Sequence, residues 1–147
     1  MLASPLPDLR ASFFLPARVS PDLAVAVHGV VLDVPMGGGL DTLAAYADGT
    51  ARYINHSGRT IVWEVPGSVN PLRPLIDRLL ASAASVPPPA AGLRWDPPAP
   101  SQASGLATVL TRGGLVTVPL GSDATSAGLL GSGAALMKAL INAIPSG

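Results

Sequence analysis

Residues 55–59, with the sequence NHSGR, concentrate the groups of this chain that could do chemistry. His56 stands beside the hydroxyl of Ser57, and Asp48 and Glu64 lie nearby along the chain. An imidazole with a neighbouring hydroxyl and an orienting carboxylate is the arrangement of an activated nucleophile. Adjacent side chains of a strand point apart, however. The spacing therefore favours a structural role, in which these groups bond to the turn backbone, over a small hydrolase that uses His56 with Ser57 or a carboxylate.

Metal and cofactor chemistry have little support in the sequence. The chain has no cysteine and two histidines, which excludes disulfides, thiolate nucleophiles and cysteine-ligated zinc or iron–sulfur sites. A metal site would need His28 and His56 to converge with carboxylates such as Asp33 or Glu64, and nothing in their spacing indicates this. We therefore predict no metal and no cofactor.

A second set of residues around His56 favours recognition of another protein. Aromatic and arginine side chains are enriched at protein interfaces, and both kinds occur on the strands expected beside this residue. Arg52, Arg59 and Arg112 could instead bind a carboxylate or phosphate bidentately, in a small-ligand or sensor site. The predicted binding surface consists of Tyr46, Arg52, Tyr53, His56, Arg59 and Trp63.

Residues 43–64 predict the strands that must position these side chains. Asp48 and Gly49 predict a two-residue type I′ hairpin turn, and residues 55–58 predict a second tight turn. Three short antiparallel strands follow, with apolar and polar side chains alternating along each. The buried face is left open, because a one-residue slip in register would exchange the two faces.

Further elements are predicted on both sides of this meander. Residues 23–34 are apolar and rich in β-branched side chains, which is typical of a strand buried on both faces. Asn70 as N-cap and Pro71 at the first helical position predict the start of a helix. An apolar stripe at helical spacing continues from there to Ala83.

The last part of the chain predicts a hairpin and a helix. Two apolar segments flank Arg112, Gly113 and Gly114, and Pro119 marks the second of them as an edge strand. Residues 129–144 carry an apolar stripe that predicts a C-terminal helix. The elements together predict one α+β domain over residues 1–147, with an antiparallel sheet of five to six strands built from a meander and a hairpin, and two main helices.

Two proline-rich segments fall outside these elements. Residues 1–22 predict an irregular arm or a single helical turn that packs Phe13 and Phe14 on the domain. Residues 85–104 predict a Pro/Ala-rich loop with some polyproline II character. Either segment could instead be a docking peptide for a partner.

Composition limits the partners and the location. Nine basic and nine acidic residues give a formal charge of zero, so the sequence has no electrostatic footprint for nucleic acid or an anionic membrane. Only 12% of the residues are charged, which favours an oligomer or a partner-bound state. The sequence lacks a long uninterrupted apolar run and a basic segment at its N-terminus, so we predict no transmembrane segment and a cytoplasmic location.

The segment YADGTARYINHSGRTIVWE resembles a group of uncharacterised bacterial proteins in which a strand, an ADG turn, a strand, an NHSG turn and a strand recur. The RGGL segment and the C-terminal ALMKALINAI are similar to that group as well. This resemblance implies a shared fold and no activity. More loosely, hairpins with two helices resemble the profilin-like and roadblock/longin-like folds, which serve as dimerising scaffolds and sensory modules.

These observations predict a non-catalytic module for protein–protein interaction, an adaptor or a subunit of a homo-oligomer or larger complex, that uses the meander surface. Two alternatives stay open. The first is a small-ligand or sensor domain with His56 and the arginines in a pocket. The second is the small hydrolase described above.

Overall fold

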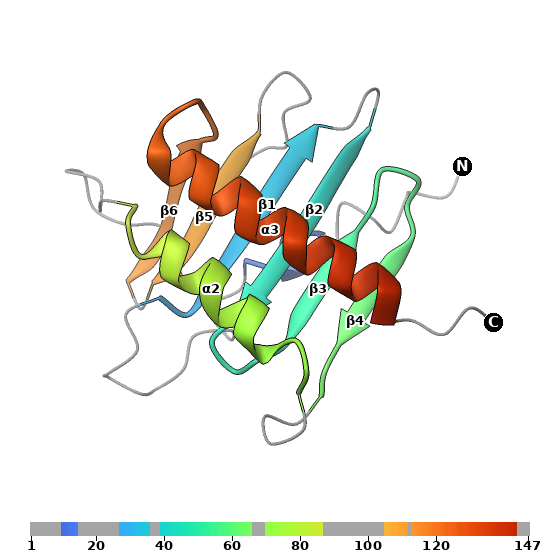
Figure 1. Cartoon of the computed structure of the whole chain (residues 1–147). Helices are drawn as coiled ribbons and strands as arrows, with labels where there is room; N and C mark the ends of the chain where they lie inside the picture. Colours follow the sequence, from blue (N-terminus) through green and yellow to red (C-terminus); the bar gives the residue numbers. More distant parts are fainter. Residues whose placement is uncertain are drawn as a thin grey trace.

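The computed structural model describes residues 10–14, 27–35, 39–65, 70–86, 105–111 and 113–143. Six strands form one antiparallel sheet, and two long helices lie together on one of its faces (Figure 1). This arrangement confirms the predicted α+β class, with a sheet built from a meander and a hairpin. The elements are β1 (Gly29–Pro35), β2 (Leu40–Tyr46), β3 (Ala51–Ile54), β4 (Thr60–Trp63), α2 (Arg73–Ala83), β5 (Leu106–Thr111), β6 (Gly114–Pro119) and α3 (Ala124–Ala143).

The strands of the sheet follow the order β4-β3-β2-β1-β5-β6. Strand β1 pairs with both β2 and β5, so these strands fill the interior of the sheet. Strands β4 and β6 form its two edges. Pro119 lies at the end of β6, as expected of a residue that cannot donate to a ladder.

The first meander turn differs from the predicted type I′ turn. Tyr46 pairs with Thr50 through a 3.0 Å bond from its N–H, which leaves three residues in the loop and not two. Gly49 has a φ of 90°, but Asp48 has no positive φ, whereas type I′ needs it at both central positions. The Asp48 carboxylate instead accepts from the N–H of Thr50 at 2.9 Å. The turn is therefore a three-residue loop closed by a left-handed glycine, and the type I′ prediction was wrong.

The main core lies between the sheet and the two helices. We call this side of the sheet the helix face, and the opposite side the second face. Helix α2 buries Ile76, Leu79 and Ala83, which belong to the predicted apolar stripe. Helix α3 adds Leu129, Leu136 and Leu140. The sheet residues of this core are Val30, Leu32, Leu43, Ala45, Ala51, Tyr53, Ile61, Ala107, Val109 and Val116.

Helix α2 begins later than the sequence predicts. Its first residue is Arg73, and Leu72 occupies the N-cap position without a side-chain capping bond. Asn70 and Pro71 lie before the helix. The Asn70 side chain still serves the start of the helix, because its Oδ1 accepts from the backbone N–H of Leu72 at 3.0 Å. The same oxygen accepts from Trp63 Nε1 at 2.9 Å, and Nδ2 donates to a backbone carbonyl of the β2–β3 turn at 2.9 Å. Asn70 thus ties the start of the helix to the meander.

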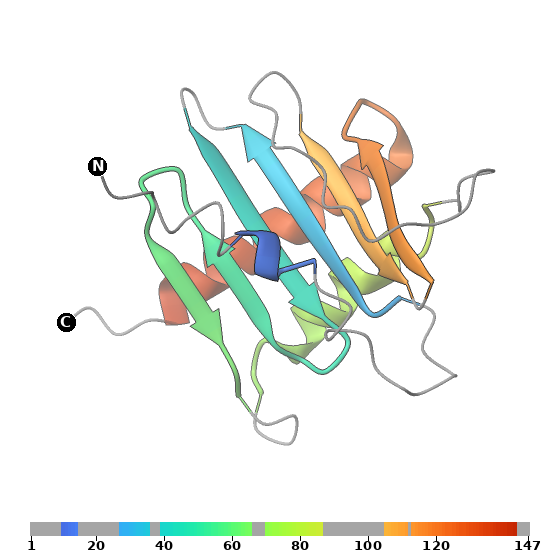
Figure 2. The same ribbon diagram turned by 180° about the vertical axis from the view of Figure 1, so that it is seen from behind.

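A short helical turn at residues 10–14 lies on the second face (Figure 2). It buries Phe13 and Phe14 completely against the sheet, as predicted for the N-terminal arm. The other residues of the predicted arm, and residues 87–104 of the predicted Pro/Ala-rich loop, fall outside the described residues.

Helix α3 is long and apolar enough to cross a membrane by length and composition alone. In this structure one side of it packs on the sheet and α2, and core helices of globular domains have the same composition. One such helix therefore does not indicate a membrane protein. The absence of a transmembrane segment and the cytoplasmic location stay predictions.

A glycine lets α3 approach the sheet closely. A Cβ atom on Gly133 would lie 2.4 Å from Leu32 Cδ1 and 3.7 Å from Leu43 Cδ2, so a side chain there would have to displace the buried side chain of Leu32. Two residues earlier, a Cβ on Gly131 would meet no atom within 4 Å. The two positions therefore differ in packing while both lie inside the same helix.

This difference predicts opposite effects for one substitution. Gly131→Ala should raise the free energy of unfolding by about 0.5–1 kcal/mol, because alanine has the higher helix propensity. Gly133→Ala gains the same propensity but overpacks the core, which typically costs about 1–3 kcal/mol. We expect Gly133→Ala to be the less stable variant by at least about 1 kcal/mol in urea denaturation. Equal stability of the two variants would contradict the close contact.

Candidate functional site

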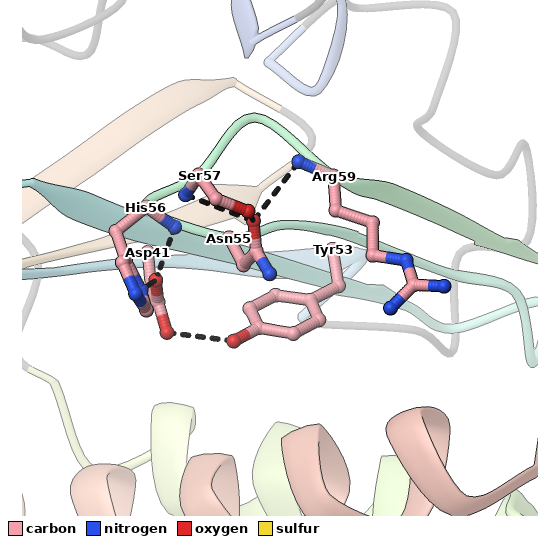
Figure 3. Close-up of polar contacts among 6 residues, drawn as sticks. All are labelled: Asp41, Tyr53, Asn55, His56, Ser57 and Arg59. Atoms are coloured by element: carbon pink, nitrogen blue, oxygen red, sulfur yellow. Dashed lines mark hydrogen bonds and ion pairs between the residues drawn. The ribbon is translucent and has the colours of Figure 1, made fainter.

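The meander brings three polar side chains together at one end of the sheet (Figure 3). Asp41 comes from the start of β2, Tyr53 from β3, and His56 from the β3–β4 turn. The register pairs Leu43 with Tyr53 and Thr42 with Ile54. Asp41 therefore lies diagonally across from Tyr53 on the same face, close to the turn that follows.

Asp41 is the centre of this cluster. Its carboxylate is buried and accepts three hydrogen bonds. Oδ2 accepts from the Tyr53 hydroxyl at 2.6 Å, and Oδ1 accepts from the His56 backbone N–H at 2.7 Å. Oδ1 also lies 3.0 Å from His56 Nδ1. Because an ionised carboxylate can only accept, a neutral His56 carries its proton on Nδ1 and keeps Nε2 as an acceptor.

The environments of the three side chains differ. The His56 side chain is 51% exposed, whereas the Tyr53 and Asp41 side chains are buried beneath it. Burial raises the pKa of Tyr53 well above its usual value, and the hydrogen bond and negative charge of Asp41 add to the effect. The phenol therefore stays protonated and holds the carboxylate that orients the imidazole.

This geometry supplies part of a catalytic arrangement. An imidazole held by a carboxylate is the base and its orienting group in a nucleophilic triad. Ser57 is bound elsewhere, because its Oγ donates to Asn55 Oδ1 at 2.7 Å and its N–H donates to the same oxygen at 3.0 Å. Asn55 Oδ1 also accepts from the N–H of Arg59 at 2.9 Å. Asn55 and Ser57 thus stabilise the turn, as the structural interpretation expects.

The predicted binding surface is divided between the two faces. Tyr53 and Trp63 point to the helix face, while Tyr46 and Arg52 point to the second face. His56 and Arg59 are exposed in the turn between β3 and β4. The structure therefore does not bring the three aromatic residues together on one surface.

Several of these side chains are also covered. Tyr46 is buried, and its hydroxyl donates to the backbone carbonyl of Phe13 at 2.8 Å. Arg52 is buried and forms an ion pair with Glu64. Arg112 lies outside the described residues. His56 and Arg59 are thus the members of the predicted set whose side chains are most accessible.

The two histidines do not approach one shared metal position. His28 is buried beside β5, where its backbone N–H donates to the carbonyl of Leu110 at 2.8 Å. His56 is paired with Asp41 in the meander turn. Within the described ranges, no group of three or more histidine, cysteine, aspartate or glutamate residues could hold a metal ion.

The carboxylate partner of His56 is Asp41, which the prediction from sequence did not include, and not Asp48 or Glu64, which lie nearer along the chain. A usable signal was present. Counting cross-strand pairs outward from the turn at Asp48 and Gly49 places Asp41 opposite residue 55 or 56, for a loop of three or two residues. The pairing register of β2 and β3 therefore predicts the carboxylate partner of His56 better than distance along the chain does.

Comparisons of the chain with protein-family models, with curated proteins and with solved structures found no match. The resemblance to a group of bacterial proteins therefore stays a prediction. Any functional assignment rests on the residues themselves.

The Asp41–Tyr53 bond predicts a specific alkaline behaviour. Because the folded pKa of Tyr53 is raised, its contribution to stability is full below the unfolded pKa of about 10 and is lost as the pH rises above it. We expect Tyr53→Phe to lower the free energy of unfolding by about 1 kcal/mol at neutral pH. Urea denaturation across the alkaline range should show a smaller further loss for Tyr53→Phe than for the wild type.

His56→Ala is the control for this measurement, since it changes the same cluster and keeps the phenol. It should follow the wild-type alkaline dependence. If Tyr53→Phe and the wild type lose stability in parallel, the ionisation of Tyr53 is not linked to folding.

Proposed function

We propose that this chain is a non-catalytic module for protein–protein interaction that assembles through the β4 edge of its sheet, in the first place with a second copy of itself. The observation that carries the proposal is Val62, a β-branched residue of the edge strand that is 55% exposed. Among the described residues no strand pairs with the outer side of β4, and the free backbone groups of such an edge are a ready template for pairing.

The backbone of β4 supports the same proposal. Asn55 donates its N–H to the carbonyl of Arg59 at 2.9 Å, which sets the alternation of hydrogen bonds along the β3–β4 ladder. Ile61 and Trp63 then use their backbone groups in the ladder, and those of Thr60 and Val62 point away from it. An incoming strand would find these donors and acceptors in line.

The other edge of the sheet is less suited to pairing. Strand β6 ends in Pro119, which has no backbone N–H, and begins at Gly114. Strand β4 has the sequence TIVW and carries neither a proline nor a charged residue. Natural sheets commonly protect an edge with such residues, so their absence in β4 favours its use as an interface.

A second copy is the partner that fits this edge most simply. Two identical β4 strands can pair antiparallel about a two-fold axis, which places Val62 of each copy in the shared interface. The formal charge of zero removes long-range repulsion between copies. His56 and Arg59 lie in the adjoining turn, where an interface has its polar rim.

The Asp41–His56 contact supports a second candidate function, a small-ligand or sensor site. A half-exposed imidazole held in one orientation by a buried carboxylate offers a ligand its Nε2, which is an acceptor in the neutral ring and a donor in the protonated one. His56→Ala separates this candidate from the first. It should leave assembly through β4 unchanged and abolish any ligand affinity of the turn.

The proposal predicts that the wild type sediments as a dimer and that Val62→Lys sediments as a monomer, because two facing ammonium groups would oppose pairing. Leu130→Lys is the matched control, since Leu130 is also an exposed large apolar residue, at 36%, but lies on α3. It should stay dimeric. Analytical ultracentrifugation over roughly 1–100 µM protein measures all three.

A wild type that is monomeric throughout this range would overturn self-assembly. A dimer that survives Val62→Lys would place the interface elsewhere. Circular dichroism of each variant confirms that a change in mass does not come from unfolding.

A further inference from the structure

The second face of the sheet carries an apolar cluster that is separate from the main core. Phe13 and Phe14 insert their rings into it, and both are fully buried. Within the described part of the chain, the helical turn at residues 10–14 is the one contributor to this cluster from outside the sheet (Figure 2). The sheet supplies Val31, Ala44, Tyr46, Ile54, Leu110 and Leu115.

A buried carboxylate on the same face holds the turn electrostatically. Asp33 is fully buried on β1, and its Oδ1 accepts from Arg10 Nε at 3.0 Å while its Oδ2 accepts from Arg10 Nη2. Thr42 donates its hydroxyl to Oδ1 at 2.7 Å. Such a bidentate pair adds directional specificity to the attraction of the charges. The Arg10 guanidinium also lies 4.9 Å from the centre of the Phe14 ring.

The third contact is to the backbone of the turn. The Tyr46 hydroxyl donates to the carbonyl of Phe13 at 2.8 Å. The Tyr46 ring packs directly over Gly29, its cross-strand partner. A Cβ on Gly29 would lie 2.7 Å from Tyr46 Cδ1, so the missing side chain leaves room for the ring. The second face thus offers the Asp33 carboxylate to an arginine and the Tyr46 hydroxyl to a backbone carbonyl. It also offers an apolar surface on which two aromatic rings pack.

The turn needs the sheet to hold its shape, whereas the main core is built without residues of the turn. Two backbone bonds, from Phe13 to Arg10 at 3.0 Å and from Phe14 to Ala11 at 3.2 Å, form the turn, and so short a helix is unstable alone in water. The main core on the helix face contains no residue of the turn. The turn therefore relates to the sheet as a short peptide ligand relates to its receptor.

We propose that the second face is a docking groove for a partner segment that carries an arginine, followed three and four residues later by two aromatic residues on one helical turn. In this structure the chain's own Arg10, Phe13 and Phe14 occupy the groove and exclude that partner. Departure of the turn removes the two hydrogen bonds that the Asp33 carboxylate accepts from Arg10. An incoming segment that brings its own guanidinium restores this bidentate pair, and the groove therefore favours such a segment. This docking uses a different face from the β4 edge and does not rest on the proposed self-assembly.

The test uses the full chain with its own turn weakened, as Arg10→Ala/Phe13→Ala/Phe14→Ala. The probe is a fluorescein-labelled synthetic peptide with the sequence of residues 5–18, and fluorescence anisotropy measures its binding. We expect the apparent Kd to be at least about tenfold lower for the triple variant than for the wild type, whose own turn competes for the groove.

Two matched controls examine the recognition chemistry. Asp33→Asn, added to the triple variant, keeps the shape and the bond with Thr42 but removes the charge, and should weaken binding of the peptide about tenfold or more. A peptide with Arg10→Lys should bind more weakly to the triple variant, because an ammonium cannot form the bidentate pair.

Each contrary result overturns the proposal. A triple variant that is unfolded by circular dichroism shows that the turn is an integral part of the fold. A folded triple variant that does not bind the peptide, or binds it equally well after Asp33→Asn, shows that the face has no such groove.

Discussion

Strands β1 and β2 are buried on both faces of the sheet, and the rest of the structure follows from the need to cover both. The two long helices lie together on one face, where they form the main core (Figure 1). The described covering of the opposite face comes from Phe13 and Phe14, which arrive from far upstream in the sequence. An apolar strand at the centre of the sheet thus gives the helical turn at residues 10–14 a defined position.

Two buried aspartates, one on each face, fix which distant segments meet. Asp33 receives its donors from Arg10 and Thr42, and Asp41 receives its donors from Tyr53 and His56. A buried carboxylate is costly unless its acceptors are satisfied, so alternative registers that separate these partners are disfavoured. The same pairs that specify the fold also define its two candidate recognition sites, one around an arginine and one around an imidazole.

Local pattern was enough to predict the strands, the second hairpin and the buried stripe of α2, because their periods appear within a few residues. The face of the sheet to which Tyr46 or Tyr53 points was not predictable in the same way. A one-residue slip in strand register would move each side chain to the opposite face. The partnership of Arg10 with Asp33 has no local signal, because it joins segments 23 residues apart through the tertiary fold. The type of the turn at Gly49 was predicted wrongly because an Asp-Gly pair occurs both in two-residue type I′ loops and in three-residue loops that end in a left-handed glycine.

The unequal edges of the sheet limit how far copies of this chain could associate. Pairing through β4 would use the one edge free of proline, and Pro119 would stand at the outer edge of each copy. A sheet with two competent edges can template an open-ended polymer, as in cross-β fibres. A sheet with one competent edge closes after a single addition, so this asymmetry would separate defined assembly from fibrillation.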